Sequence, residues 1–325
     1  MNKLKEYLKE HPDLKYTYFG GKGGVGKTVV AAAMALWMAE QGKRTLLAST
    51  NPVHSLSNLF QMDVFGRPVK IPDAENLYVQ EIDTKDVIEK SKKEIKEKIS
   101  WFLKYADIPT KADDFIESAT MNPAFEESAM FENMINIIFE DQFEFYVFDT
   151  APTANARRLL GMSKIYTLWV NKMLKSREEA KQIRLSLSFR KKKVEDEEDP
   201  LLSYLTTFRD RIFKMKDILT DEQRSAFFFV TLLESLPIAV IRRFIGWFRE
   251  FGIPIGGVIV NQVIDKEKVG ESEVEFVQNR IRMQERYRKE LQDSIGNVLS
   301  EIPLFEKEIR GLDMVKRVSE EMFSP

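Results

Sequence analysis

The sequence of 325 residues carries a formal net charge of −2, with 43% hydrophobic and 31% charged residues. This near-neutral balance argues against a nucleic-acid partner, and no apolar run approaches the roughly 18 residues that a membrane span requires. The start of the chain is polar and charged, so we expect a cytoplasmic protein without a signal peptide. The absence of cysteine excludes a cysteine-based zinc site, and we expect no zinc.

Short apolar runs alternate along the chain with longer stretches in which apolar residues recur at helical spacing. This alternation predicts an α/β fold with a doubly wound, mostly parallel sheet. The runs lie near residues 16–19, 45–48, 77–81, 145–148, 226–232, 258–260 and 298–302.

Two intervals between these runs, residues 84–141 and 159–224, are too long and too helical to be simple crossovers between strands. We expect them to pack together as a helical subdomain, inserted into a single domain that spans residues 1–325. The interval 159–224 also contains a basic and an acidic block beside Pro200, which indicates an exposed loop.

The glycine-rich segment after the first apolar run is the most informative part of the chain. Its glycines, followed by Lys27 and Thr28 and then a helical stretch, form the pattern of a phosphate-binding loop, or P-loop. We expect backbone N–H groups and the helix dipole to bind phosphates, Lys27 to reach the β- and γ-phosphates, and Thr28 to ligate Mg²⁺. The candidate nucleotide-binding residues of this loop are Gly21, Lys22, Gly23, Gly24, Val25, Gly26, Lys27, Thr28 and Val29.

Three other segments follow apolar runs and carry polar side chains. Asp149 ends a hydrophobic run, which is the Walker B arrangement, and we expect it to hold Mg²⁺. The segment around Asn51 follows a predicted strand and is placed to sense the γ-phosphate. Asn261 ends a late strand, and its amide can hydrogen-bond adenine through a donor and an acceptor.

The loop also has a second lysine, Lys22, at the position of the deviant Walker A signature. Together with Asn-Pro-Val-His-Ser-Leu-Ser, Asp-Thr-Ala-Pro-Thr, Val-Asn-Gln and Pro-Leu-Phe-Glu-Lys-Glu-Ile-Arg-Gly, in that order, it makes the chain resemble one family. This family comprises the arsenical pump-driving ATPases and the tail-anchored membrane protein targeting ATPases. The resemblance extends over nearly the whole chain.

The resemblance implies a homodimer that binds ATP or ADP with Mg²⁺. It implies that Lys22 contacts the nucleotide of the partner subunit, that Glu234 reaches nucleotide in the dimer and that Asn261 contacts adenine. It further implies a loop that closes over the base, comprising Pro303, Leu304, Phe305, Glu306, Lys307, Glu308, Ile309 and Arg310.

Two departures from the family pattern concern hydrolysis. Asn51 stands where the family usually has Asp, and an amide can orient the attacking water but cannot accept its proton. Residues 154–156 read Ala-Asn-Ala where the family has Gly-His-Thr, which removes a flexible backbone position. We therefore predict a slow ATPase in which Lys22, Asn51 and Asp149 are the catalytic residues.

The resemblance favours a targeting factor that couples nucleotide state to the binding of hydrophobic tail-anchored segments and meets the membrane only indirectly. One alternative is the energising ATPase subunit of an arsenite-type anion efflux pump, which the lack of thiols disfavours. The other is a nucleotide-gated scaffold with negligible hydrolysis, which the departures at Asn51 and Ala154 favour.

Both predicted insertions are rich in methionine and aliphatic residues. Methionine adapts to varied apolar partners, so these residues fit either a groove for a client helix or ordinary core, and we favour core for most of them. They are Met121, Phe125, Met130, Phe131, Met134, Ile135, Ile137 and Ile138 in one insertion, and Met162, Ile165, Leu168, Trp169, Val170, Met173 and Leu174 in the other.

Overall fold

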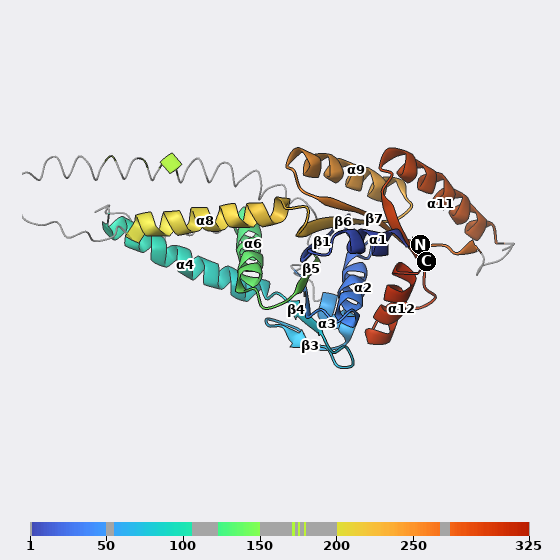
Figure 1. Cartoon of the computed structure of the whole chain (residues 1–325), viewed down its shortest axis with the longest axis horizontal. Helices are drawn as coiled ribbons and strands as arrows, with labels where there is room; N and C mark the ends of the chain where they lie inside the picture. The colour runs from blue at the N-terminus through green and yellow to red at the C-terminus, as the bar shows by residue number, and fades with distance from the viewer. Residues whose placement is uncertain are drawn as a thin grey trace, which may run out of the picture.

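The computed structural model describes residues 2–49, 55–105, 123–149, 200–266 and 274–324, together with positions 171, 172, 175 and 179. In this part of the chain, an 8-stranded sheet has the order β3-β4-β2-β5-β1-β6-β7-β8 (Figure 1). Its strands are β1 (Tyr16–Gly20), β2 (Thr45–Ser49), β3 (Val69–Lys70), β4 (Leu77–Glu81), β5 (Phe145–Asp149), β6 (Ser225–Thr231), β7 (Ile255–Val263) and β8 (Val298–Pro303). Neighbouring strands are parallel, except that β3 is antiparallel to β4.

Helices cover both faces of this sheet. The described helices are α1 (Lys3–Glu10), α2 (Lys27–Glu40), α3 (Ser55–Phe60), α4 (Thr84–Tyr105), α6 (Pro123–Glu140), α8 (Pro200–Thr220), α9 (Ser235–Glu250), α11 (Glu275–Ser294) and α12 (Leu312–Met322). Helices α1, α2, α3 and α12 contribute to one core cluster, and α6, α8, α9 and α11 contribute to another. This arrangement confirms the predicted doubly wound α/β fold.

The central strands read as continuous apolar runs because both of their faces are buried. In β1, Phe19 packs into the cluster with α2, whereas Tyr16 and Tyr18 pack into the cluster with α9. Helix α2 is apolar around its whole circumference, as expected for a helix enclosed by the sheet and its neighbours. Its residues from Val30 to Leu36 are all buried. The P-loop therefore joins two of the most deeply buried elements.

Helices α4, α6 and α8 fall within the two intervals that the sequence marks as insertions, and they extend to the left of the sheet in Figure 1. Met134, Ile135 and Ile138 of α6 share a buried cluster with Met215 and other residues of α8. Met130 is buried in a smaller cluster with α4 residues. These methionines and isoleucines are therefore core, whereas Ile137 is half-buried against that core.

The other residues considered for a groove lie outside the described part of the chain or have side chains that it does not describe. They are Met121, Phe125, Phe131, Met162, Ile165, Leu168, Trp169, Val170, Met173 and Leu174. The assignment of residues 1–325 to a single domain that carries an inserted helical subdomain stays a prediction.

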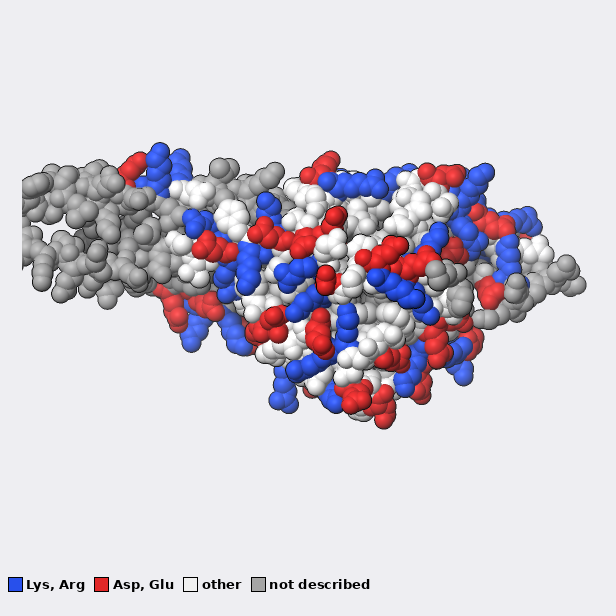
Figure 2. All heavy atoms as spheres, viewed as in Figure 1, with Lys and Arg blue, Asp and Glu red and all other residues white. Residues whose placement is uncertain are grey.

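The molecular face in Figure 2 carries interspersed acidic and basic side chains. Among the described helices, none combines the length and the apolar character that crossing a bilayer demands.

Candidate nucleotide-binding site

The P-loop leaves the carboxyl end of β1 and enters α2 at Lys27. Gly24 has φ 81° and Gly26, the N-cap of α2, has φ 88°. These left-handed conformations are strained for residues with a Cβ atom, and glycine adopts them without that strain. The backbone thus turns the first N–H groups of α2 toward the space beyond the sheet edge, where a phosphate can lie.

One side of the loop is fitted closely to neighbouring strands and the other side is open. A Cβ atom added at Gly21 would lie 2.3 Å from the carbonyl oxygen of Val230 in β6. A Cβ atom at Gly26 would lie 2.3 Å from Nδ2 of Asn261 in β7. At Gly23 and Gly24 an added Cβ would meet nothing within 4 Å. Strands β6 and β7 thus pack closely against one side of the loop, and its other side is accessible to a ligand.

Two lysines of the loop lie close together. The Lys27 ammonium group donates a hydrogen bond of 3.2 Å to the carbonyl oxygen of Lys22. Burial lowers the pKa of Lys27, and the Asp149 carboxylate acts in the opposite direction. The half-buried ammonium group of Lys27 can exchange this carbonyl partner for phosphate oxygens, which form stronger, charge-assisted hydrogen bonds. The contact of Lys22 with a second subunit's nucleotide stays a prediction.

Asp149 ends β5 with only 1% of its surface exposed. Its Oδ2 atom accepts hydrogen bonds from the hydroxyl groups of Thr28, at 2.6 Å, and Ser49, at 3.3 Å. Burial raises the pKa of Asp149, and these hydroxyl groups together with Lys27 oppose that rise. The sequence-predicted pair of Thr28 and Asp149 is therefore assembled at one point on the sheet edge.

This pair fits Mg²⁺, a hard cation that binds oxygen ligands and commonly takes only one or two carboxylates beside substrate phosphates and water. Within the described residues, no cluster of three or more His, Cys, Asp or Glu side chains could hold a metal ion. An all-protein metal cage is therefore not formed there, and a site shared with nucleotide phosphates suits the residues present.

Asn261 lies behind the P-loop, with 4% of its surface exposed. Its Nδ2 atom donates a 3.0 Å hydrogen bond to the carbonyl oxygen of Val25, and its Oδ1 atom accepts a 2.9 Å bond from the Gln262 N–H group. Both ends of the amide are thus engaged within the protein. The structure shows Asn261 connecting β7 to the P-loop, whereas its predicted contact with adenine stays a prediction.

Glu234 and the late loop lie at the carboxyl ends of β6 and β8. Glu234 is the N-cap residue of α9, and its carboxylate lies 3.2 Å from Arg280 of α11. In the late loop, Leu304 donates its N–H group to Val263 and exposes its side chain. Phe305 packs against the core below the Arg317 guanidinium group.

The rest of the predicted base-closing loop combines anchored and exposed residues. Pro303 is the last residue of β8, and Ile309 packs against the core. Glu306 pairs with Arg317 and Glu308 pairs with Arg310, each at 3.0 Å. Lys307 is exposed. The loop is thus fixed at its start and near its end, while its charged groups face outward.

Two further residues lie at the same sheet edge, and sequence reasoning gave neither of them a role of its own. Ser49 contacts Asp149 directly, and the buried Glu81 carboxylate accepts hydrogen bonds from the start of α3. A signal for Glu81 was present, because it ends an apolar run just as Asp149 does. Asn51 and residues 154–156 lie outside the described part of the chain.

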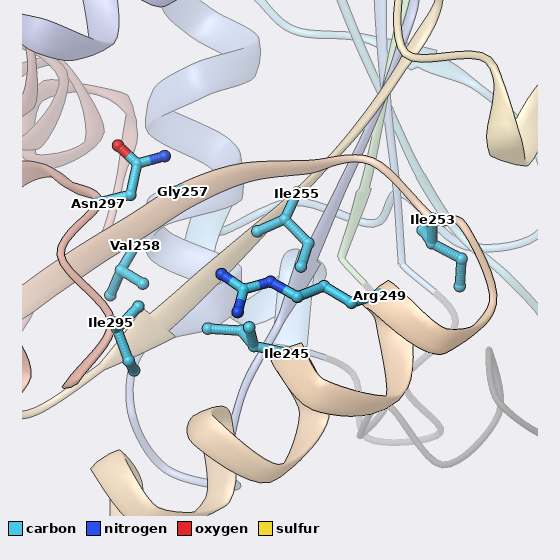
Figure 3. Close-up of a pocket in the computed structure, with 8 residues that line it drawn as sticks. All are labelled: Ile245, Arg249, Ile253, Ile255, Gly257, Val258, Ile295 and Asn297. Carbon is cyan, nitrogen blue, oxygen red and sulfur yellow. The ribbon is translucent and has the colours of Figure 1, made fainter.

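A cavity of about 270 Å³ lies at the opposite edge of the sheet (Figure 3). It is lined by α9, the start of β7 and the segment before β8, and the Arg249 side chain extends across it. Ile255 at the cavity begins β7, whereas Asn261 behind the P-loop lies near the other end of that strand. The cavity is therefore separate from the nucleotide-binding residues.

A glycine loop joined to a helix N-terminus, beside a hydroxyl group and a strand-end carboxylate, defines a P-loop nucleotide triphosphatase. The model of the family described as anion-transporting ATPase matches residues 14–324. The chain therefore belongs to this family, and the protein is an ATPase.

Several curated relatives match almost the full chain. ATPase ASNA1 homolog 2 of Paramecium tetraurelia is 28% identical over 99% of this chain and 97% of its own length. Putative arsenical pump-driving ATPase 2 of Aquifex aeolicus is 29% identical over 94% of this chain and 98% of its own. ATPase GET3C of Arabidopsis thaliana is 30% identical over 93% of this chain and 80% of its own. The similarity thus includes both arsenical pump-driving and ASNA1/GET3 ATPases.

Proposed function

We propose that the protein is a homodimeric, cytoplasmic targeting ATPase that couples its nucleotide state to the binding of hydrophobic tail-anchored membrane protein segments. The observation that carries this proposal is the P-loop assembly, in which Lys27 binds the Lys22 carbonyl oxygen and interacts with Asp149, the partner of Thr28. Family membership and the full-length similarity to ASNA1 and GET3 ATPases support it. The targeting role itself rests on the sequence resemblance described above.

The residues of the site have distinct roles in this proposal. The loop N–H groups hold the phosphates, and Lys27 gives up the Lys22 carbonyl oxygen to bind them. Thr28 and Asp149 would hold Mg²⁺ with the nucleotide, and the ion would supply charge neutralisation during phosphoryl transfer. Asn51 would orient the attacking water, while Lys22 would reach across the dimer to the partner's nucleotide.

The dimer part of the proposal is tested by the Lys22→Ala substitution. We expect ATP and Mg²⁺ to shift the wild-type protein to a dimer in sedimentation velocity, because each Lys22 would meet a phosphate on the facing subunit. Lys22→Ala should weaken this shift, and Lys22→Arg should retain it by keeping the charge. Equal ATP-dependent dimerisation of wild type and Lys22→Ala would falsify the trans role.

The client part is tested with a soluble peptide that carries a tail-anchored transmembrane segment and a photo-crosslinker. We expect more crosslinking with ATP than with ADP, because coupling requires different affinities of the two nucleotide states for the client. The control is a peptide of the same length in which charged residues interrupt the transmembrane segment. Substitution of the half-exposed Phe213 of α8 by Ser tests whether this exposed apolar side chain contributes to the crosslinking, which it should then weaken.

The alternatives give different outcomes. Stimulation of ATP turnover by arsenite, with no client crosslinking, would favour the energising subunit of an anion pump. Undetectable single-turnover hydrolysis, with nucleotide-dependent partner binding retained, would favour the scaffold. The same experiments therefore distinguish targeting, transport and scaffold functions.

A further inference from the structure

The cavity at the amino ends of β7 and β8 has mainly aliphatic walls. Of the 8 residues that line it, those with aliphatic side chains come from α9, from the turn that follows it, from the start of β7 and from the segment before β8. Ile245, Ile253 and Val258 are buried, and Ile255 and Ile295 are half-buried. These described lining residues include no Asp or Glu. Such walls favour an apolar group that displaces water from them.

The charged group of this cavity is the guanidinium group of Arg249. Its side chain leaves the last turn of α9 and extends across the cavity, past Ile245 and Ile255 and toward Asn297 (Figure 3). The Asn297 side chain is held in place, because its Nδ2 atom donates a 2.9 Å hydrogen bond to the carbonyl oxygen of Gly256. The cavity thus combines aliphatic walls with one cation.

Arg249 differs from the other arginines of α9 in its partners. Arg242 pairs with Glu290 of α11 at 3.0 Å, and the Arg243 guanidinium group lies 4.7 Å from the centre of the Trp247 ring. In the part of the chain that the structure describes, no carboxylate and no aromatic ring pairs with Arg249. Its planar set of N–H donors therefore faces an apolar cavity without an anion of the protein to bind.

We propose that this cavity is a binding site for a small monocarboxylate with a branched aliphatic chain. The carboxylate would bind Arg249 through two parallel N–H···O bonds, a geometry that guanidinium groups favour, and the aliphatic chain would lie against the Ile and Val side chains. The volume of about 270 Å³ is below the roughly 300–1,000 Å³ of pockets for drug-sized ligands, so the ligand has to be small.

The probe is 4-methylpentanoate, titrated into the 325-residue protein with ¹³C-labelled isoleucine methyl groups. Four isoleucines line the cavity, so their methyl signals report binding at this place. We expect saturable chemical-shift changes there, with a Kd on the order of 1 mM, because a ligand of few atoms gains limited affinity. Saturating ADP and Mg²⁺ should leave this Kd unchanged, since the P-loop lies at the other edge of the sheet.

Three further ligands separate the two parts of the proposed recognition. The amide 4-methylpentanamide keeps the shape of the probe and removes its charge, whereas acetate and inorganic phosphate keep a charge and lack the aliphatic chain. Each should bind at least about 10-fold more weakly than 4-methylpentanoate, because each loses either the charge-assisted hydrogen bonds or the apolar contact. Acetate or phosphate binding as tightly as the probe would overturn the proposal in favour of simple anion binding.

The matched variants are Arg249→Gln and Arg243→Gln. Both arginines are exposed residues of α9, so neither substitution should prevent folding, but only Arg249 lines the cavity. We expect Arg249→Gln to weaken binding of 4-methylpentanoate at least about 10-fold, to the level of the amide, and Arg243→Gln to leave the Kd unchanged. An unchanged Kd in Arg249→Gln, or no saturable shift of the cavity isoleucines in the wild type at about 20 times the expected Kd, would overturn the proposal.

Discussion

The two sides of the carboxyl edge of the sheet differ in the burial and the partners of their carboxylate side chains. On the β5 side, formed by β4, β2, β5 and β1, the carboxylates of Asp149 and Glu81 are buried and bound by hydroxyl and N–H groups. On the β7 side, formed by β6, β7 and β8, Glu234 forms an exposed ion pair with Arg280. Buried charges act in a low dielectric, whereas exposed pairs are screened by water.

This difference indicates a division of labour within one site. The β5 side offers fixed, desolvated oxygen atoms, which suit a metal ion and phosphates whose positions must be exact to a few tenths of an ångström. The β7 side offers exposed charges that can change partners, which suits the contacts with the base and with a second subunit that we propose. The following predictions test the comparison, beginning with the largest expected effect.

Asp149→Asn should have the largest effect on activity. We expect ATP turnover to fall about 100- to 1000-fold, because a charged ligand of Mg²⁺ is lost from a buried site. Steady-state hydrolysis measures this fall, with Glu301→Gln, which removes the carboxylate that binds Arg288, as the control. Turnover equal to wild type would show that the β5 side does not bind the metal.

The same variant should stabilise the protein without nucleotide. Burial raises the pKa of Asp149, so the folded state binds the proton more tightly than the unfolded chain does. This group therefore lowers stability as the pH rises from the ordinary carboxyl pKa through the raised value. Asn removes this cost, and we expect a gain of about 1 kcal/mol in urea unfolding near neutral pH. The gain should vanish at a pH below the ordinary carboxyl pKa.

Gly21→Ala and Gly23→Ala compare the two faces of the P-loop. We expect Gly21→Ala to cost about 2–4 kcal/mol of stability or to abolish ATP binding, since the new Cβ would meet the Val230 carbonyl oxygen. Gly23→Ala meets nothing within 4 Å and should cost less than about 1 kcal/mol. Thermal unfolding and nucleotide titration of both variants check this order.

Asn51→Asp should raise turnover about 10- to 100-fold, because it supplies the missing proton acceptor. The Kd for ATP should stay nearly constant, since the P-loop is untouched. Single-turnover rates with and without Ala154→Gly check the result, because Ala154 could limit the same step. A wild type with ordinary turnover that Asn51→Asp slows would contradict the slow-ATPase hypothesis.

Arg280→Ala should have the smallest effect. Its pair with Glu234 is exposed, so we expect less than about 0.5 kcal/mol of lost stability, diminishing further at high salt. Urea unfolding at two salt concentrations measures it. A loss above 2 kcal/mol would mean that the β7 side is as rigid as the β5 side.

The sequence predicted seven of the 8 described strands, because most of their residues are buried and read as apolar runs. The short β3 was missed, since 2 residues give no period. Strand order was also not predicted, because contacts such as Gly21 with Val230 join residues far apart in the chain.

The candidate site was predicted where a local motif carries its chemistry, as at Lys27, Thr28 and Asp149. Glu81 ends an apolar run, but it was missed because its partners, Leu56 and Ser57, lie 25 and 24 residues away along the chain and only the fold brings them to it. For Asn261, an amide can bind an adenine base or a backbone carbonyl equally well, and only the fold shows its bond to Val25. Residue type fixed the chemistry in each case, whereas the partner depended on tertiary structure.

Gly21 and Gly26, the two tightly fitted glycines of the P-loop, also differ in whether a second substitution elsewhere could make room for a side chain. The obstacle at Gly21 is a main-chain oxygen of Val230, which every amino acid at position 230 retains, so no second-site change there can relieve it. The obstacle at Gly26 is the side chain of Asn261, which another residue can shorten. Among distant homologues, position 21 should therefore remain glycine, whereas residues 26 and 261 can change together, within the limits of the positive φ at position 26.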